Sequence, residues 1–130
     1  MKREKIAIIG GGNIGTAIAE GLKLSGGFKS SDIVLTKRDL SKAQKIKRLG
    51  CKISNDNKAA VQNVDFVVLA VQPKQVRSIL EEIAVELNPK QILISVVSGV
   101  SFADMQEIIE KKITLFRVMP NTAISIQQSM

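Results

Sequence analysis

Near its start the chain reads Lys5-Ile6-Ala7-Ile8-Ile9-Gly10-Gly11-Gly12-Asn13-Ile14-Gly15. The first half of this stretch is a short apolar run, typical of a strand that is buried on both faces. The second half fits the pattern G-x-G-x-x-G and leads into apolar residues at helical spacing. The pattern alone is weak evidence, but between a strand and a helix it predicts a dinucleotide-binding turn.

Each glycine of the pattern has a physical role in such a turn. Gly10 permits the tight turn, Gly12 lets the backbone approach a pyrophosphate, and Gly15 lets the helix pack closely on the strand. The free N–H groups of Asn13 and Ile14 lie at the expected helix start, where the helix dipole favours phosphate. The alternative interpretation is a purely structural glycine turn.

Working outward from this turn, apolar runs alternate with helical periods along the whole chain. We expect strands at residues 5–9, 33–35, 51–53, 65–71, 91–97 and 113–118. Between them we expect five helices. The first has Ile14, Ala17, Ile18, Gly21 and Leu22 on one face. The second is capped by Ser41 and ends at Gly50, the third covers residues 58–62, and the fourth runs from Pro73 to Leu87. The fifth is capped by Ser101, with Phe102, Met105, Ile108 and Ile109 facing inward. This alternation predicts an α/β fold, a Rossmann-type doubly wound parallel sheet of order 3-2-1-4-5-6 in three layers.

The end of the second expected strand bears on which dinucleotide would bind. An NAD site usually places Asp or Glu there to bind the ribose 2′-hydroxyl, whereas this chain reads Thr36-Lys37-Arg38. Arg38 can form a forked hydrogen bond with a 2′-phosphate, and Lys37 adds a positive charge. Asp39 follows directly and could bind ribose. We therefore expect NADP(H) to be preferred and NAD(H) to be possible, the alternative being an ordinary solvated turn.

Three further segments follow the fourth, fifth and sixth expected strands, at the ligand-facing edge of such a sheet. Ala70, Val71, Gln72 and Pro73 can line the ribose and phosphates of a cofactor. Ser98 and Gly99 leave room for a nicotinamide ring. The third segment is Met119, Pro120, Asn121 and Thr122, directly after the sixth expected strand.

Composition excludes several classes of site. The chain of 130 residues has no His and a single cysteine, Cys51, so a Ser-His-Asp triad, a His-ligated metal and an intrachain disulfide are all excluded. We expect no metal site and a structural role for Cys51. No stretch is long and apolar enough for a membrane span, and we expect a cytoplasmic protein without membrane contact.

The net charge of +7 is concentrated in the first half of the chain. Residues 1–58 hold 13 Lys and Arg against 5 Asp and Glu, whereas residues 59–130 hold 6 against 7. Such a basic region attracts phosphate. Nucleic acid is not an expected partner, because interleaved aromatic residues and a recognition helix are missing.

Taken together, the motifs resemble pyrroline-5-carboxylate reductase. The resemblance rests on the glycine turn, Asn57 within residues 56–60, and the segments 70–73, 95–100 and 117–122, in this order and at this spacing. It covers nearly all 130 residues and places Asn57 near the adenosine and Arg38 in the 2′-phosphate loop. It further places Gly99 and the segment Met119 to Thr122 near the nicotinamide and the substrate. Gln72 stands where that family usually has Lys, Ala123 where it usually has Pro, and Ser98 where Ala is common.

The resemblance implies NAD(P)H-dependent reduction of the C=N bond of 1-pyrroline-5-carboxylate, a small molecule, to L-proline. It further implies that residues 1–122 form the cofactor-binding domain. Residues 123–130 would begin the connection to a C-terminal helical domain, absent from this chain, through which the full-length protein forms a homodimer or larger oligomer. No catalytic residue can be named, and we expect the chain by itself to be inactive.

Two alternatives stay open. One is another two-domain NADP-dependent reductase or dehydrogenase, similar to 3-hydroxyacid dehydrogenases or to deazaflavin-dependent NADP reductases. The other is a non-catalytic NADP-binding module. The sequence beyond residue 130 and an assay of a full-length chain would distinguish them.

Overall fold

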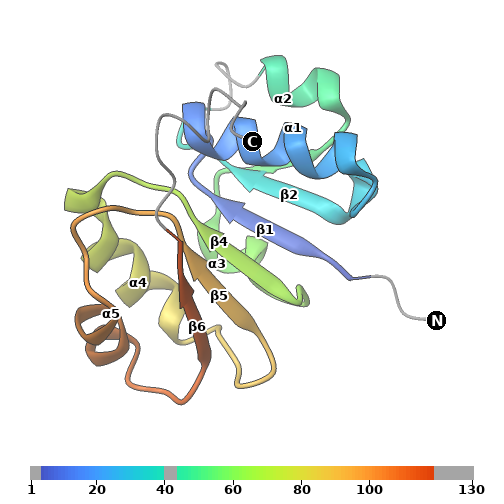
Figure 1. The fold of residues 1–130 in the computed structure, drawn as a ribbon. Helices are drawn as coiled ribbons and strands as arrows, with labels where there is room; N and C mark the ends of the chain where they lie inside the picture. Colours follow the sequence, from blue (N-terminus) through green and yellow to red (C-terminus); the bar gives the residue numbers. More distant parts are fainter. Residues whose placement is uncertain (1–3, 40–43, 119–130) are drawn as a thin grey trace.

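Six short strands form one parallel sheet in the order β3-β2-β1-β4-β5-β6 (Figure 1). The computed structural model describes residues 4–39 and 44–118. The strands are β1 (Ile6–Ile9), β2 (Ile33–Thr36), β3 (Lys52–Ser54), β4 (Phe66–Leu69), β5 (Ile92–Ser95) and β6 (Thr114–Arg117). The predicted sheet order is confirmed, and most strands are shorter than expected.

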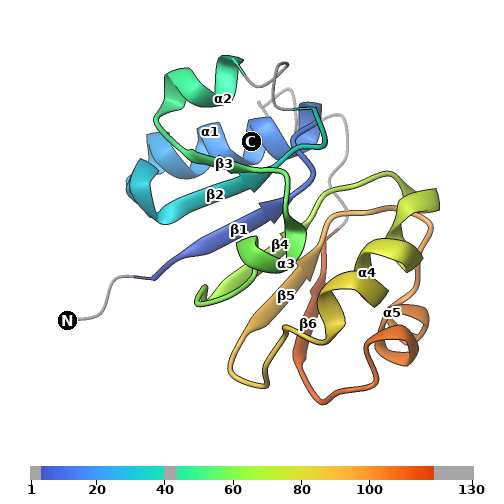
Figure 2. The same cartoon turned by 180° about the vertical axis from the view of Figure 1, so that it is seen from behind.

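Helices cover both faces of the sheet and complete three layers. They are α1 (Asn13–Ser25), α2 (Gln44–Leu49), α3 (Asn57–Ala60), α4 (Val76–Ala84) and α5 (Phe102–Ile109), with short 3₁₀ turns at Ser30–Asp32 and Pro73–Gln75. In both views α1 and α2 lie over β1 to β3, whereas α4 and α5 lie on the opposite face over β4 to β6 (Figures 1 and 2). The predicted doubly wound architecture is therefore confirmed.

The two faces of the central strands supply two separate cores. Ile8 pairs with Leu35 on one side and Val68 on the other, and these three side chains pack under α1 and α2. The alternate residues Ala7 and Ile9 join the core beneath α4 and α5. All five are less than 5% exposed. Fully burying a large aliphatic side chain contributes about 1.5–3 kcal/mol, so the apolar run holds the sheet from both faces.

The inward face of α1 differs in part from the expected one. Ile18 and Leu22 pack against the core as expected, whereas Ala17 and Gly21 are exposed. Gly15 and Ala19 are its buried residues, whereas Ile14 is 53% exposed. The reason is the close approach of α1 to the strand that precedes it, since a Cβ on Gly15 would collide with the carbonyl oxygen of Gly10. Because α1 lies so close to the sheet there, only small residues fit on the side that faces the sheet, and the Ile14 side chain is turned away from the sheet.

Phe102 is a second correction, because it is 48% exposed rather than facing inward. It is the first residue of α5, and the buried stripe of that helix begins one turn later, at Met105 and Ile109. Ser101 caps this helix as expected, since its hydroxyl accepts a hydrogen bond from the Asp104 N–H at 3.1 Å. The expected cap at Ser41 lies outside the described residues.

Cys51 lies directly before β3 and is 7% exposed. Burial raises the pKa of its thiol, and the nearby positive charge of Lys23 lowers that pKa by a smaller amount. A buried thiol that stays protonated behaves as a small apolar side chain. Within residues 4–39 and 44–118, no helix has the length and apolar character needed to cross a membrane.

Candidate cofactor-binding site

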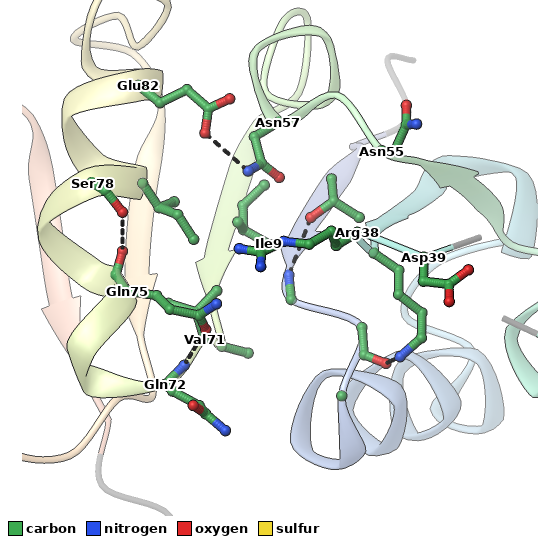
Figure 3. A pocket seen from close by; sticks show the side chains of 17 residues that line it. Ile9, Arg38, Asp39, Asn55, Asn57, Val71, Gln72, Gln75, Ser78 and Glu82 are labelled. Carbon is green, nitrogen blue, oxygen red and sulfur yellow. Dashed lines mark hydrogen bonds between the residues drawn. The ribbon is translucent and has the colours of Figure 1, made fainter. Parts of the chain in front are cut away.

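A cavity of about 730 Å³ opens at the carboxyl ends of β1, β2 and β4, between the glycine turn and α4 (Figure 3). Strands β2 and β3 are added on one side of β1 and strands β4 to β6 on the other, so the strand order reverses between β1 and β4. Ligands of open α/β sheets bind at such a switch point. The cavity is lined by Ile9, Gly10, Gly11, Gly12, Thr36, Lys37, Arg38, Asp39, Asn55, Asn57, Ala70, Val71, Gln72, Gln75, Ser78, Ile79 and Glu82.

The glycine turn is tight against β4 and open toward solvent. Gly10 has φ +113°, and a Cβ there would lie 2.5 Å from the carbonyl oxygen of Ala70. Gly12 has no atom within 4 Å of the position that a Cβ would take. Side chains are thus excluded where the backbone turns, and space is left where a phosphate would approach the start of α1. The first turn of α1 carries no acidic residue, which also suits an anion.

The end of β2 holds the glycine turn in place. The Gly10 N–H donates to the hydroxyl oxygen of Thr36 at 3.2 Å. The ammonium of Lys37 donates to the carbonyl oxygen of Gly11 at 2.8 Å, and the Thr16 hydroxyl donates to the same oxygen at 3.2 Å. Lys37, expected from the sequence as a charge for the cofactor, is therefore also a brace for the glycine turn.

Arg38 lines the cavity beside Lys37, and its guanidinium reaches into it. Figure 3 shows its guanidinium extending from the end of β2 toward α4, with Asp39 remaining on the β2 side. Both residues are exposed. A guanidinium in this position can bind a phosphate through two parallel hydrogen bonds.

The opposite wall is one face of the α4 segment, which sequence reasoning missed. Gln75, Ser78, Ile79 and Glu82 line the cavity there. The Gln75 side-chain oxygen accepts a hydrogen bond from the Gln72 N–H at 3.1 Å, which fixes the turn after β4. The side-chain amide of Asn57 donates to a carboxylate oxygen of Glu82, also at 3.1 Å. The spacing of Gln75, Ser78 and Glu82 by three and four residues was the available signal.

The structure brings together nine of the predicted residues in this cavity and leaves others outside its lining. The nine are Gly10, Gly12, Thr36, Lys37, Arg38, Asn57, Ala70, Val71 and Gln72. Asn13 lines an adjoining hollow of about 400 Å³ at the start of α1. Ile14, Gly15, Pro73, Ser98 and Gly99 line neither, and Met119, Pro120, Asn121 and Thr122 lie outside the described residues.

The residues present fit a dinucleotide. A backbone cradle free of side chains faces the start of a helix, and a guanidinium, an amide and a carboxylate lie at the other end of the same cavity. Such an arrangement binds and orients a cofactor, which itself supplies the reactivity. Among the described residues there is no group of three or more metal-ligating side chains.

Comparison with known proteins identifies the family. The model of the family described as NADP oxidoreductase, coenzyme F420-dependent, matches residues 5–99, which include the glycine turn, Arg38 and the α4 wall. The chain belongs to this family. The region that matches the F420-dependent NADP oxidoreductase family makes up most of the chain.

Curated relatives of this family member include pyrroline-5-carboxylate reductases. It is 44% identical over 125 residues to pyrroline-5-carboxylate reductase 1 of Dictyostelium discoideum, covering 96% of the chain and 23% of that protein. It is 39% identical to pyrroline-5-carboxylate reductase 2 of the same organism, covering all of the chain and 45% of that protein. The chain thus spans about half or less of the length of these relatives, and the resemblance found in the sequence is confirmed.

Solved structures agree in fold. A pyrroline-5-carboxylate reductase from Coxiella burnetii superposes with a TM-score of 0.88 at 33% identity, over 96% of this chain and 47% of that one. The Plasmodium falciparum pyrroline carboxylate reductase with NADP bound superposes with a TM-score of 0.81 at 24% identity, over 94% of this chain and 44% of that one. The family member therefore has the fold of the part of these enzymes that it covers.

Proposed function

We propose that this chain is the cofactor-binding part of a pyrroline-5-carboxylate reductase, which uses NAD(P)H to reduce the C=N bond of 1-pyrroline-5-carboxylate to L-proline. The observation that carries the proposal is the cavity between the glycine turn and α4, in a chain whose curated relatives have that name. Hydride transfer to such a carbon depends chiefly on positioning of the cofactor and the substrate.

The glycine turn would bind the pyrophosphate, with Gly10, Gly12 and Gly15 providing the close approach and Asn13 and Ile14 the N–H groups at the start of α1. Ala70, Val71, Gln72 and Pro73 would lie along the cofactor. Ser98 and Gly99 would lie near the nicotinamide, and Met119 to Thr122 near the nicotinamide and the substrate. No catalytic residue is assigned, because the segment proposed to lie near the substrate, Met119 to Thr122, is outside the described residues.

NADP(H) is the proposed preferred cofactor, with NAD(H) possible. Support comes from the Arg38 guanidinium in the cavity and from the NADP-bound structure of the Plasmodium falciparum enzyme. A hydrogen bond to a charged group is worth about 1.5–3 kcal/mol, which corresponds to about a ten-fold preference or more.

The rest of the protein is proposed from the relatives' greater length. Residues 1–122 would form the cofactor domain, and residues 123–130 would lead into a helical domain through which two or more copies associate. The cytoplasm as compartment and the lack of nucleic-acid and membrane partners remain predictions from composition.

A second candidate is reduction of a deazaflavin by NADPH, favoured by the description of the matching family. The test uses the chain and a version extended to the length of the relatives. We expect the chain to bind NADPH in calorimetry without turnover, and the extended protein to oxidise NADPH with pyrroline-5-carboxylate. Turnover with a deazaflavin and none with pyrroline-5-carboxylate would favour the second candidate. NADPH binding with no turnover of either would indicate a non-catalytic binding module.

A further inference from the structure

We infer that Glu82 limits the preference of this site for NADP(H) over NAD(H), through its own charge and through the orientation it imposes on Asn57. The inference rests on the proposed function, since it takes a nicotinamide dinucleotide as the ligand of the cavity. Arg38 on one wall would attract a 2′-phosphate, and Glu82 on the other would oppose it.

The Asn57–Glu82 pair joins two elements that meet at the cavity. Asn57 is the first residue of α3, and Glu82 lies on α4. Both line the cavity together with Arg38, and the Asn57 amide nitrogen lies 3.1 Å from a Glu82 carboxylate oxygen. Figure 3 shows these two side chains turned toward each other above the Arg38 guanidinium.

The chemistry of the two groups determines which atom of Asn57 is left for a ligand. An ionised carboxylate only accepts hydrogen bonds, so the NH₂ group of Asn57 must face Glu82. The amide oxygen therefore lies on the other side, away from Glu82 (Figure 3). An amide oxygen accepts a hydrogen bond from a ribose hydroxyl, whereas a fully ionised phosphate has no proton to donate.

The negative charge of Glu82, like the orientation of Asn57, disfavours a 2′-phosphate in the cavity. The ribose of a dinucleotide lies at the end of the second strand in folds of this type, which is where Arg38 is located. A 2′-phosphate beside Arg38 would share the cavity with the Glu82 carboxylate. Repulsion between two exposed negative charges in one cavity changes affinity by about two- to ten-fold at low salt and is screened as salt rises.

The test compares Glu82→Gln with Glu86→Gln in the chain. The side-chain amide oxygen introduced by Glu82→Gln can still accept the hydrogen bond from Asn57, while the negative charge is removed. Glu86 is a matched control, since it accepts a hydrogen bond from the Gln62 side-chain amide at 2.8 Å and does not line the cavity. Both changes remove one negative charge, and only the first removes it from the cavity.

The measurement is calorimetric titration with NADPH and with NADH at low and at high salt, with a thermal melt of each variant. We expect Glu82→Gln to tighten NADPH binding about two- to ten-fold, to change NADH binding less than two-fold, and to lose most of this difference at high salt. Glu86→Gln should leave the ratio of the two affinities unchanged.

An unchanged ratio in Glu82→Gln, or an equal shift in Glu86→Gln, would overturn the inference and leave the proposed function standing. A salt-independent shift would overturn the role given to the charge of Glu82, because repulsion between exposed charges is screened by salt. If the parent chain binds neither nucleotide, the proposed function and this inference fall together.

Discussion

The ammonium of Lys37 donates a hydrogen bond of 2.8 Å to the carbonyl oxygen of Gly11, and so ties the end of β2 to the glycine turn. The neighbouring residue, Arg38, extends into the cavity instead (Figure 3). Two adjacent cations therefore have different surroundings. One holds the backbone that would contact the pyrophosphate, and the other is available to a 2′-phosphate.

Replacing Lys37 with Met should weaken both nucleotides alike. The variant keeps the apolar stem and removes the donor to Gly11, so the glycine turn loses one of its braces. We expect NADPH and NADH affinities to fall together, by about three- to ten-fold, because a hydrogen bond from a charged donor is lost. Calorimetric titration with both nucleotides measures this. A loss confined to NADPH would mean that Lys37 binds the 2′-phosphate directly.

Replacing Arg38 with Ala should weaken NADPH selectively. Its guanidinium is the group in the cavity that can form two hydrogen bonds with a phosphate. We expect NADPH affinity to fall about ten-fold or more, with less than a two-fold change for NADH. Lys74→Ala serves as the control, since this exposed cation does not line the cavity. Equal losses for the two nucleotides would contradict the assignment of Arg38.

Adding a methyl group at Gly15 should destabilise the fold and abolish nucleotide binding. A Cβ there would meet the carbonyl oxygen of Gly10, which is backbone and cannot move away cheaply. We expect Gly15→Ala to lower the free energy of unfolding by about 1–3 kcal/mol.

Gly21, in the same helix, provides a matched control for Gly15. Apart from the backbone of its own helix, no atom lies within 4 Å of a Cβ placed on Gly21. Gly21→Ala should therefore stabilise the chain by about 0.5–1 kcal/mol through the higher helix propensity of Ala. Urea titration followed by circular dichroism measures both variants. If Gly15→Ala were as stable as Gly21→Ala, the close approach of α1 to the glycine turn would be disproved.

Gln91 should matter for stability and not for the cofactor. It is 2% exposed at the amino end of the sheet, opposite the cavity. Its side-chain nitrogen donates to the carbonyl oxygens of Val61 at 2.7 Å and Val64 at 2.9 Å, and its oxygen accepts from the Asn88 N–H at 3.1 Å.

Replacing Gln91 with Leu leaves these backbone groups without that partner. A buried polar group left unsatisfied costs about 1–3 kcal/mol, so the midpoint of urea unfolding should fall while NADPH affinity at low temperature stays the same. Reduced affinity in the folded variant would show that the two ends of the sheet are coupled.

Much of the fold and part of the site follow from local patterns. The strand order and three layers could be predicted because each strand and helix has its own apolar period, and because the glycine turn after β1 indicates where the strand order reverses. The cavity residues at the ends of β1, β2 and β4 were predictable for the same reason, since the carboxyl ends of parallel strands meet at one edge.

Other features depended on distances that no local pattern contains. Periodicity placed Ile14 and Phe102 inward. The approach of α1 to the turn at Gly15, and the packing of α5 from Met105 onward, decided instead which side chains are covered.

By itself, then, the sequence determined the α/β architecture and the place where a dinucleotide would bind, because apolar periods and glycines act locally. Only the tertiary structure decided how the charged side chains of that site are used. The Lys37–Gly11 and Asn57–Glu82 contacts join residues 26 and 25 positions apart. A hydrogen bond depends on atoms meeting within about 3 Å, and the packing of β2 beside the glycine turn and of α3 beside α4 brings them that close.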